Sequence, residues 1–382
     1  MNREKVFQRI DELQTEYRSF WADVVALESP TEDKALVDAC GAYYAAKASE
    51  KGWKVTVTPI VGSGDIVTIT LNPDAPGKPI VFSGHIDTVH PAGLFGTPAV
   101  HMDEKNIYGP GCEDCKGGTV GAFLAMAALD DCGYRDRPVK LILQSDEENS
   151  SRTSGKATVR AMYEEAKDCE VFLNLEPYFP PYCAGTRKGI SKYRFTVTGK
   201  AVHASRCDSG ISAIAEAAYK ILELEKQKDP DGITCSCGLI SGGTAVNAVP
   251  EKCTFALDLR FATKEQMEQG DAIVQKVAET SYIPGSTCEL ELLSRRYAME
   301  DTEKNQAVRA RVNSLLAAIG IPPFVPHLDK GGSDAADMTN YGLPTIESIG
   351  IVGGGAHSIR EWASLESLPE LAKRLAAITL YL

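Results

Sequence analysis

Long apolar runs are missing from this sequence of 382 residues. A helix needs about 20 consecutive apolar residues to cross a bilayer, and the best apolar stretch, residues 121–129, is far shorter than that. The first ten residues are polar, and no apolar segment of the kind found in secretory signals follows them. We therefore expect a cytoplasmic protein that does not bind membranes.

Basic residues are scarce relative to acidic ones. The sequence has 40 Lys and Arg against 52 Asp and Glu, which gives a net charge of -12. Proteins that bind nucleic acid or anionic membranes need a cationic face, so we expect no nucleic-acid partner. The 11 cysteines are scattered over a long chain in an odd number. This distribution fits reduced thiols in the cytosol better than a disulfide scaffold.

Apolar periodicity predicts helices and strands in the first half of the chain. An amphipathic helix is predicted over residues 6–27, where apolar residues recur at alternating steps of four and three. Residues 29–32 have the pattern of a capping box that opens a second helix. Short apolar strands then alternate with helices as far as about residue 186. This alternation predicts an α/β sheet that is covered by helices on both faces.

Residues 187–299 have a different pattern. Tyr193, Phe195 and Val197 alternate with polar residues, which predicts a half-exposed strand. Further strands and two helices follow, and together they suggest a separate α+β sandwich. The α/β pattern returns at about residue 300 and includes a predicted strand over residues 345–351. We therefore predict one domain from residues 1–186 and 300–382, with residues 187–299 inserted into it.

The 6 histidines include two that stand beside predicted strand ends. His85 follows a buried strand, and Asp87 faces the same way in an extended segment. The Asp87 carboxylate could therefore bond one imidazole nitrogen while the other binds a metal ion. By itself, His85 could equally be a capped loop histidine. His357 follows the last predicted strand on a glycine-rich turn, residues 353–355.

Acidic residues stand at similar places. Asp114 lies in a glycine-rich segment just before a helix, where a carboxylate can bridge two cations. Glu147 and Glu148 follow another strand. Of two such neighbours, one can bind metal while the other acts as a general base, although an acidic loop is usually just solvated. Glu176 closes the next strand. Ligands of open α/β sheets bind at this edge, and two histidines with three carboxylates suit paired zinc, cobalt or manganese ions.

The pair Cys112 and Cys115 has the spacing of a redox or zinc motif. A structural zinc site needs a second pair with similar spacing, and Cys235 and Cys237 are too close together. A thiol hydrolase that uses Cys112 or Cys115 as its nucleophile remains an alternative.

Taken in order, these segments resemble the co-catalytic zinc exopeptidase and aminoacylase family. That family includes glutamate carboxypeptidase, acetylornithine deacetylase, succinyl-diaminopimelate desuccinylase and peptidase T. The resemblance implies an α/β/α catalytic domain with a mixed sheet and an inserted α+β sandwich that serves as a lid and dimerisation domain. It also implies two divalent metal ions per subunit, zinc with cobalt or manganese as alternatives, and a homodimer formed through the lid.

The resemblance further assigns roles to metal-binding residues. His85 and Glu176 would bind one ion, and Glu148 and His357 the other. Asp114 would bridge the two ions.

Other roles carried over from the family concern catalysis and substrate binding. Asp87 would orient His85, and Glu147 would be the general base. His203, in a segment that resembles the lid of the family (residues 199–205), would stabilise the oxyanion in the active site of the partner subunit. Arg260 and Asn247, with the turn that contains Gly355, would contact the substrate. Arg260 could instead simply pair with Asp258.

The predicted activity is that of a carboxypeptidase, which releases a C-terminal amino acid from a short or N-acylated peptide. The segment Gly109-Pro110-Gly111 and residues 330–334 are similar to the glutamate-carboxypeptidase branch. Two departures from the family pattern are Cys115 and the turn at residues 207–209. An N-acyl-amino-acid deacylase or a dipeptidase with the same site is the second hypothesis, and a non-catalytic relative is the third.

Overall fold

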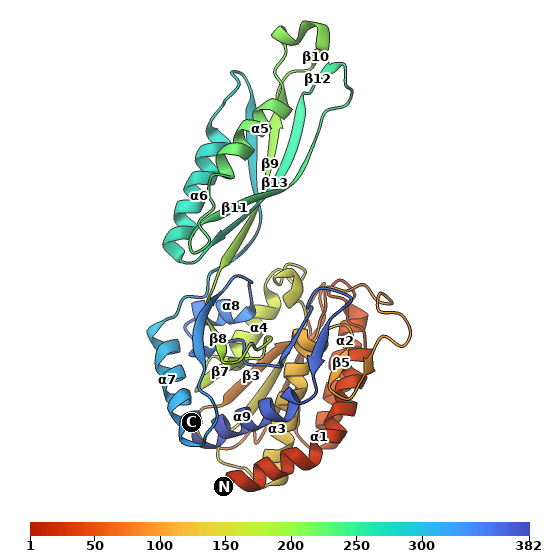
Figure 1. Cartoon of the computed structure of the whole chain (residues 1–382), viewed down its shortest axis with the longest axis vertical. Coiled ribbons are helices and arrows are strands. Elements are labelled where there is room, and N and C mark those ends of the chain that lie inside the picture. Colours follow the sequence, from red (N-terminus) through yellow and green to blue (C-terminus); the bar gives the residue numbers. More distant parts are fainter. The chain divides into compact units, whose positions relative to one another are not determined.

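The computed structural model describes residues 1–382, and the chain divides into two compact units. Unit 1 comprises Met1–Gly185, Asp301–His327 and Ser333–Leu382, whereas unit 2 comprises Thr186–Glu300 and Leu328–Gly332. The chain therefore leaves unit 1 to build most of unit 2, returns to unit 1 at Asp301, and adds the short segment Leu328–Gly332 to unit 2 before it completes unit 1 (Figure 1). The assignment of unit 2 as a lid and dimerisation domain stays a prediction.

A six-stranded mixed sheet forms the centre of unit 1. Its strands in spatial order are β1 (Lys54–Thr58), β2 (Ile66–Leu71), β6 (Val139–Gln144), β3 (Ile80–His85), β7 (Val171–Asn174) and β16 (Thr345–Ile346). The pairs β1–β2 and β2–β6 are antiparallel, whereas β6, β3, β7 and β16 run parallel to one another. Because parallel strands end at the same edge, His85 at the end of β3 is paired with Gln144 at the end of β6.

Helices cover both faces of this sheet. They are α1 (Arg3–Ala26), α2 (Lys34–Glu50), α3 (Gly117–Asp131), α4 (Ala157–Ala166), α7 (Glu303–Ala318), α8 (Asp334–Asn340) and α9 (Ser367–Tyr381). One face packs against α3, which contacts α1 and α9 (Figure 1), and the other packs against α4 and α8. Side chains alternate across a strand, so the neighbours Val81 and Phe82 belong to different apolar clusters. The predicted α/β/α architecture with a mixed sheet is confirmed.

The first two helices show what local patterns can and cannot predict. The apolar stripe of residues 6–27 corresponds to α1, but the predicted capping box does not start α2. The N-cap of α2 is Asp33, whose side chain accepts a hydrogen bond from the N–H of Leu36. The hydroxyl groups of Ser29 and Thr31 instead donate to the Ile86 carbonyl and the Asp87 carboxylate. This loop is therefore bound to the segment that follows β3.

The last strand of the sheet is shorter than predicted. It ends at Ile346 rather than at residue 351, because Ser348 has a φ of 57°, which a strand does not allow. Further short strands were not predicted from the sequence. They are β4 (His101–Met102), β5 (Asn106–Tyr108), β17 (Gly353–Gly354) and β18 (Trp362–Ser364), which form a small sheet, and the pair β8 (Tyr182–Arg187) and β15 (Val325–Asp329).

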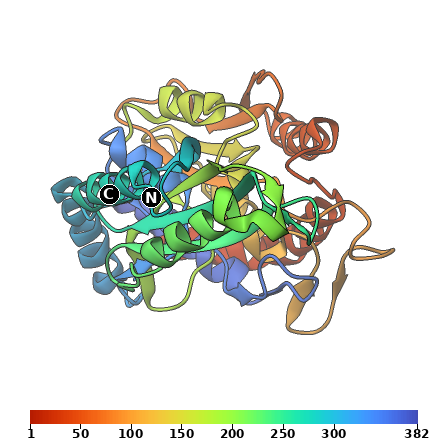
Figure 2. The same cartoon turned by 90° about the horizontal axis from the view of Figure 1, so that it is seen from above.

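Unit 2 contains a four-stranded antiparallel sheet with two helices. The spatial order is β11 (Thr234–Gly242), β13 (Lys252–Phe261), β9 (Gly189–Thr198) and β14 (Thr287–Arg296). The helices α5 (Ala213–Leu224) and α6 (Lys264–Glu279) contact each other and lie along the same face of the sheet (Figures 1 and 2). A pair of two-residue strands, β10 (Val202–His203) and β12 (Ala248–Val249), completes the unit.

None of the helices combines the length and the apolar character that crossing a membrane would require.

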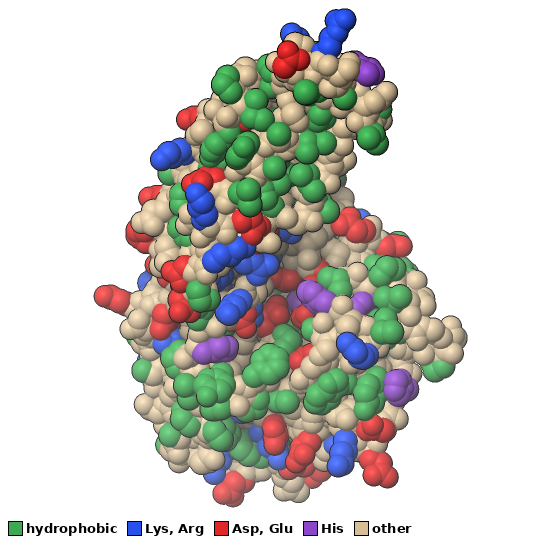
Figure 3. Space-filling model, turned by 45° about the horizontal axis from the view of Figure 1, so that its top comes forward, with side chains coloured by type: hydrophobic (Ala, Val, Ile, Leu, Met, Phe, Trp, Pro, Cys, Tyr) green, Lys and Arg blue, Asp and Glu red, His purple; other side chains and the backbone are tan.

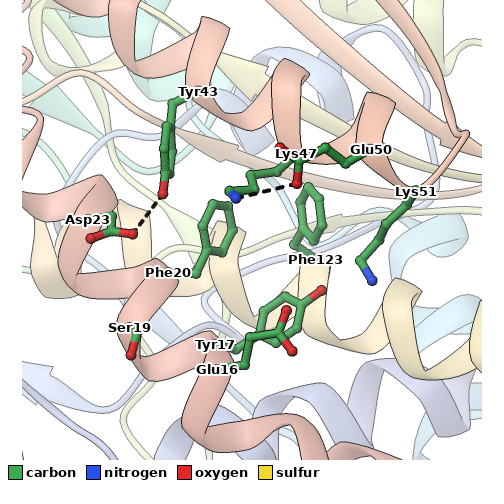
Figure 4. Close-up of a pocket in the computed structure, with 10 residues that line it drawn as sticks. All are labelled: Glu16, Tyr17, Ser19, Phe20, Asp23, Tyr43, Lys47, Glu50, Lys51 and Phe123. Carbon is green, nitrogen blue, oxygen red and sulfur yellow. Dashed lines mark hydrogen bonds and ion pairs between the residues drawn. The ribbon is translucent and has the colours of Figure 1, made fainter.

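Aromatic rings fill the space between α1, α2 and α3 (Figure 4). Phe123 of α3 is 1% exposed. Its ring lies 4.9–6.3 Å, centroid to centroid, from the rings of Trp53, Phe20, Tyr17 and Tyr44. A surface pocket of about 420 Å³ lies beside these rings, and its lining includes charged side chains such as Lys47, Glu50 and Lys51 (Figure 4).

We predict that Phe123→Ala lowers the free energy of unfolding of unit 1 by about 3–5 kcal/mol, because it removes a buried ring and leaves a cavity in its place. Tryptophan fluorescence during urea unfolding measures this directly, since all 3 tryptophans, Trp21, Trp53 and Trp362, lie in unit 1. Val61→Ala is the control, because Val61 is 94% exposed and its loss should leave the urea midpoint unchanged. A Phe123→Ala midpoint equal to that of the control would contradict the prediction.

Candidate metal centre

Five predicted ligands converge at the edge of the sheet where the parallel strands end. His85 is the last residue of β3. The others lie in turns or loops that follow or precede regular elements: Asp114 in the turn η1 (Cys112–Lys116), Glu148 in the turn η2 (Glu147–Asn149), Glu176 after β7, and His357 after β17. Each turn is short, so the backbone of the sheet and of α3 determines where these side chains lie.

Asp114 contacts both histidines. Its Oδ1 lies 3.0 Å from Nε2 of His85, and its Oδ2 lies 3.3 Å from Nε2 of His357. Oε1 of Glu176 is 3.8 Å from the same nitrogen of His85, and Oε2 of Glu148 is 3.0 Å from Nε2 of His357. The five side chains thus form two groups, His85 with Glu176 and His357 with Glu148, which are joined by Asp114.

The imidazole of His85 has the orientation of a metal ligand. Its Nδ1 lies 3.0 Å from the backbone carbonyl oxygen of Asp87, so in the neutral ring Nδ1 carries the proton and Nε2 is left as the donor atom for a metal. The carboxylate of Asp87 is more distant from Nδ1, at 3.5 Å. It accepts hydrogen bonds from the N–H groups of Glu147 and Glu148, both at 3.2 Å. Asp87 therefore holds the turn of Glu147 as well as the ring of His85.

The carboxylates of the cluster are sheltered from solvent. Glu147 and Glu176 are each 8% exposed. Burial raises the pKa of Glu148 to about 7, and burial together with the Asp114 charge raises the pKa of Glu176 well above its usual value. Burial acts in the same direction on Asp114, but its contacts with His357 and His85 outweigh burial and lower its pKa.

The two histidines respond to the same charges. Contacts with Asp114 and Glu148 raise the pKa of His357 to about 10. Burial opposes protonation of His85, but the carboxylates of Asp114 and Asp87 outweigh it and raise the pKa of His85 well above its usual value. Without another cation, the cluster therefore has to bind protons to offset its negative charge.

These residues fit divalent metal ions. Donor atoms of His85, Asp114 and Glu148 all lie within 4.8 Å of one another, and so do those of His85, Cys115 and Glu176. Imidazole nitrogens and carboxylate oxygens are ligands for zinc, cobalt and manganese. The Cys115 thiol donates to the backbone carbonyl of Leu175 at 3.0 Å, so this sulfur is already engaged behind the cluster.

Three other predicted site residues lie in unit 2. His203 is exposed, and its Nδ1 lies 2.9 Å from Oγ of Ser205. Asn247 is exposed in the loop between β11 and β12. Arg260 of β13 donates to Asp258 at 2.9 Å and to the carbonyl of Lys330 at 2.8 Å. The pairing with Asp258 is thus present, and the roles of all three residues at the site stay predictions.

Gly355 belongs to unit 1 and has a φ of 79°. A Cβ atom here would lie 2.6 Å from the carbonyl oxygen of Arg360. The turn that carries His357 therefore needs glycine at this position for its backbone alone, whether or not Gly355 contacts substrate.

Sequence reasoning missed two buried residues next to the cluster. Glu361 is 1% exposed and accepts hydrogen bonds from three backbone N–H groups of the segment that carries Asp114. His90 lies in a loop and is 5% exposed, with Nε2 3.4 Å from Oε2 of Glu361. The sequence around a single loop glutamate does not show whether its side chain is buried or solvated, because the groups that bond to Glu361 are distant in the chain.

Comparisons with known proteins identify the family of this chain. Residues 81–381 match the sequence model of peptidase family M20/M25/M40. Carboxypeptidase G2 of Pseudomonas sp. (strain RS-16) is 26% identical over 358 residues, which cover 91% of this chain and 84% of that protein. Succinyl-diaminopimelate desuccinylase of Helicobacter pylori (strain Shi470) is 26% identical over 311 residues, which cover 76% of this chain and 77% of that protein.

A similar fold is found among solved structures. The structure of a tripeptidase from Staphylococcus aureus subsp. aureus Mu50 matches with a TM-score of 0.79 at 18% identity, over 99% of this chain and 98% of that chain. The family match spans most of the sequence, and its range includes all five proposed ligands, from His85 to His357. The chain therefore belongs to peptidase family M20/M25/M40 and is a metal-dependent hydrolase.

Proposed function

We propose that this hydrolase is a dinuclear metallo-carboxypeptidase that releases a C-terminal amino acid from a short or N-acylated peptide. The observation that carries the proposal is the double contact of Asp114 with His85 and His357, which fits a carboxylate shared by two ions. The similarity to carboxypeptidase G2, over 91% of this chain, supports the choice of a carboxypeptidase among the activities of the family.

The five clustered residues would hold the two ions. His85 and Glu176 would bind one, His357 and Glu148 the other, and Asp114 both, with zinc as the proposed metal. When bound, such ions polarise the carbonyl of the scissile amide and lower the pKa of water.

Glu147 is the proposed general base. It precedes Glu148 in η2, and its backbone N–H donates to the Asp87 carboxylate at 3.2 Å. Its charge acts on the carboxylates of both Glu148 and Glu176. It would accept a proton from the attacking water and then deliver that proton to the nitrogen of the departing amine. Its low exposure of 8% limits competition from bulk solvent for this transfer.

Residues of unit 2 would bind the substrate. The guanidinium of Arg260 is oriented by Asp258 and by the carbonyl of Lys330, and an oriented guanidinium is well suited to hold a free carboxylate. Asn247 and the turn of Gly355 would assist this binding. His203 would stabilise the negative charge that develops on the carbonyl oxygen.

We also propose a homodimer formed through unit 2. Strand β11 is at the edge of its sheet, where unpaired backbone groups favour pairing with another chain. Leu222 of α5 and Leu239 and Ile240 of β11 are 66%, 73% and 58% exposed, and hydrophobic side chains are spread over the visible surface of this unit (Figure 3). Both features support an interface.

A second candidate activity is removal of an acyl group from an N-acyl amino acid by the same residues. The similarity to succinyl-diaminopimelate desuccinylase, at 26% identity over 311 residues, favours it specifically.

Substrate choice can be decided with a small panel: dipeptides with a free C-terminus, N-acyl dipeptides and N-acyl amino acids. We expect release of the C-terminal residue from peptides, lost after chelation and restored by added zinc, as measured by the amine set free. Release from N-acyl amino acids alone would replace the carboxypeptidase proposal with the deacylase. No hydrolysis by protein that verifiably holds two metal ions would reject both activities.

We predict that Glu147→Gln lowers kcat by about 10²–10⁴-fold, the range for loss of a general base, while metal content and fold are retained. Steady-state kinetics, elemental analysis and circular dichroism provide the three measurements. Glu104→Gln, at an exposed position, is the matched control and should keep wild-type kcat. A folded, metal-loaded Glu147→Gln enzyme with wild-type kcat would rule out this role.

If His203 acts in the site of the partner subunit, two inactive variants should complement each other. We expect that mixing His203→Ala with Glu147→Gln protomers restores about a quarter of wild-type activity, because half of randomly formed dimers are mixed and each of these has one intact site. Mass spectrometry would verify the mixed dimers. Verified mixed dimers without activity would argue that His203 does not act across subunits.

A further inference from the structure

We infer that Glu361 is a positioning residue of the metal centre: its buried carboxylate fixes the backbone segment that presents Asp114 to both histidines. The inference rests on the metal-binding part of the proposed function and is independent of the substrate.

Three hydrogen bonds join the Glu361 carboxylate to this one segment. Its Oε1 accepts hydrogen bonds from the N–H groups of Glu113 at 2.9 Å and Asp114 at 3.1 Å. Its Oε2 accepts from the N–H of Gly111 at 3.0 Å. Hydrogen bonds to a charged acceptor are stronger than those between neutral groups, and at 1% exposure water does not compete for them.

The segment needs such a partner because its backbone is irregular. Gly111 has a φ of 72°, and Asp114 has φ and ψ of -112° and 90°, which is not helical. The N–H groups at the start of a helical turn have no partner within the turn. Gly111 also packs closely, since a Cβ atom there would lie 2.7 Å from Cγ2 of Thr88. The three N–H groups therefore converge on one carboxylate instead of on successive carbonyl groups.

Glu361 also belongs to the loop that carries His357. It follows His357 by four residues, and its own N–H donates to the carbonyl of Ser358 at 3.1 Å. The next residue, Trp362, begins β18 and pairs with Tyr108 of β5, just before the Asp114 segment. One residue thus joins the loop of His357 through its backbone to the segment of Asp114 through its side chain. The 3.3 Å contact between Asp114 and His357 depends on that connection.

His90 provides the remaining polar contact of this carboxylate, with Nε2 3.4 Å from Oε2. The imidazole is itself held in place, because its ring packs edge-on against Phe95 at a centroid distance of 4.9 Å. Glu361 is therefore constrained from both sides, by the backbone of the Asp114 segment and by a buried side chain.

The test compares Glu361→Ala and Glu361→Gln with wild type, in the full-length protein. We expect Glu361→Ala to bind Zn²⁺ about 10- to 100-fold more weakly, the usual effect of removing a group that orients metal ligands, as measured by competition with a chelator. The absorption spectrum of the Co²⁺-loaded protein should change as well, because it reports ligand geometry. Glu361→Gln should lie between wild type and Glu361→Ala, because its remaining oxygen can still accept from Glu113 and Asp114.

Glu216 offers a matched control. It is a glutamate of unit 2 with 0% exposure whose carboxylate also accepts from two backbone N–H groups, those of Tyr282 and Ile283. Glu216→Gln should reduce stability without changing zinc affinity or the Co²⁺ spectrum.

The outcomes are clear-cut. Weakened zinc binding in folded Glu361 variants, with normal binding in the Glu216→Gln control, supports the inference. Wild-type zinc affinity and a wild-type Co²⁺ spectrum in folded Glu361→Ala overturn it. If Glu361→Ala does not fold, Glu361→Gln decides by the same two measurements. Neither needs a substrate, so a failure of the proposed peptidase activity would show separately, as a protein that binds metal and hydrolyses nothing in the panel.

Discussion

Carboxylates that share a small buried space repel one another unless positive charge lies between them. In unit 1, Asp114, Glu148 and Glu176 are held around two imidazoles at 3.0–3.8 Å. The sheet imposes this crowding, since its parallel strands are packed on both faces and end at one edge. Metal ions would relieve a repulsion that the fold creates, so metal binding and the stability of these loops should be coupled.

Acidic residues that are not proposed ligands hold the loops that carry the ligands. Asp87 accepts the N–H groups of Glu147 and Glu148, and Glu361 accepts those of three residues around Asp114. In both places a buried carboxylate replaces the carbonyl partners that a longer helix would provide. Because Asp87 and Glu361 fix the backbone of these loops, the carboxylate oxygens of the proposed ligands remain available to bind metal. This arrangement adds still more negative charge near the site.

The parts of the fold that were predictable are those determined within a short stretch of sequence. The apolar stripe of α1 depends on local periodicity, so it could be located from the sequence. The buried strand expected before His85 is also present, although it extends far enough to include His85 itself. The start of α2 could not, because Ser29 and Thr31 bond to residues more than fifty positions away. The early end of β16 depends on the backbone of Ser348. Likewise, the proposed ligands could be selected from strand ends and family resemblance, whereas Glu361 could not.

The two cysteines next to Asp114, Cys112 and Cys115, are both buried. Burial raises the pKa values of Cys112 and Cys115 well above normal, which disfavours the thiolate form that a nucleophile or redox centre requires. Cys115 donates to the carbonyl of Leu175, and its sulfur would lie 3.1 Å from a Cβ placed on Gly84. It therefore fills the space between the backbones that lead to His85 and to Glu176. A larger side chain there would push these two proposed ligands apart.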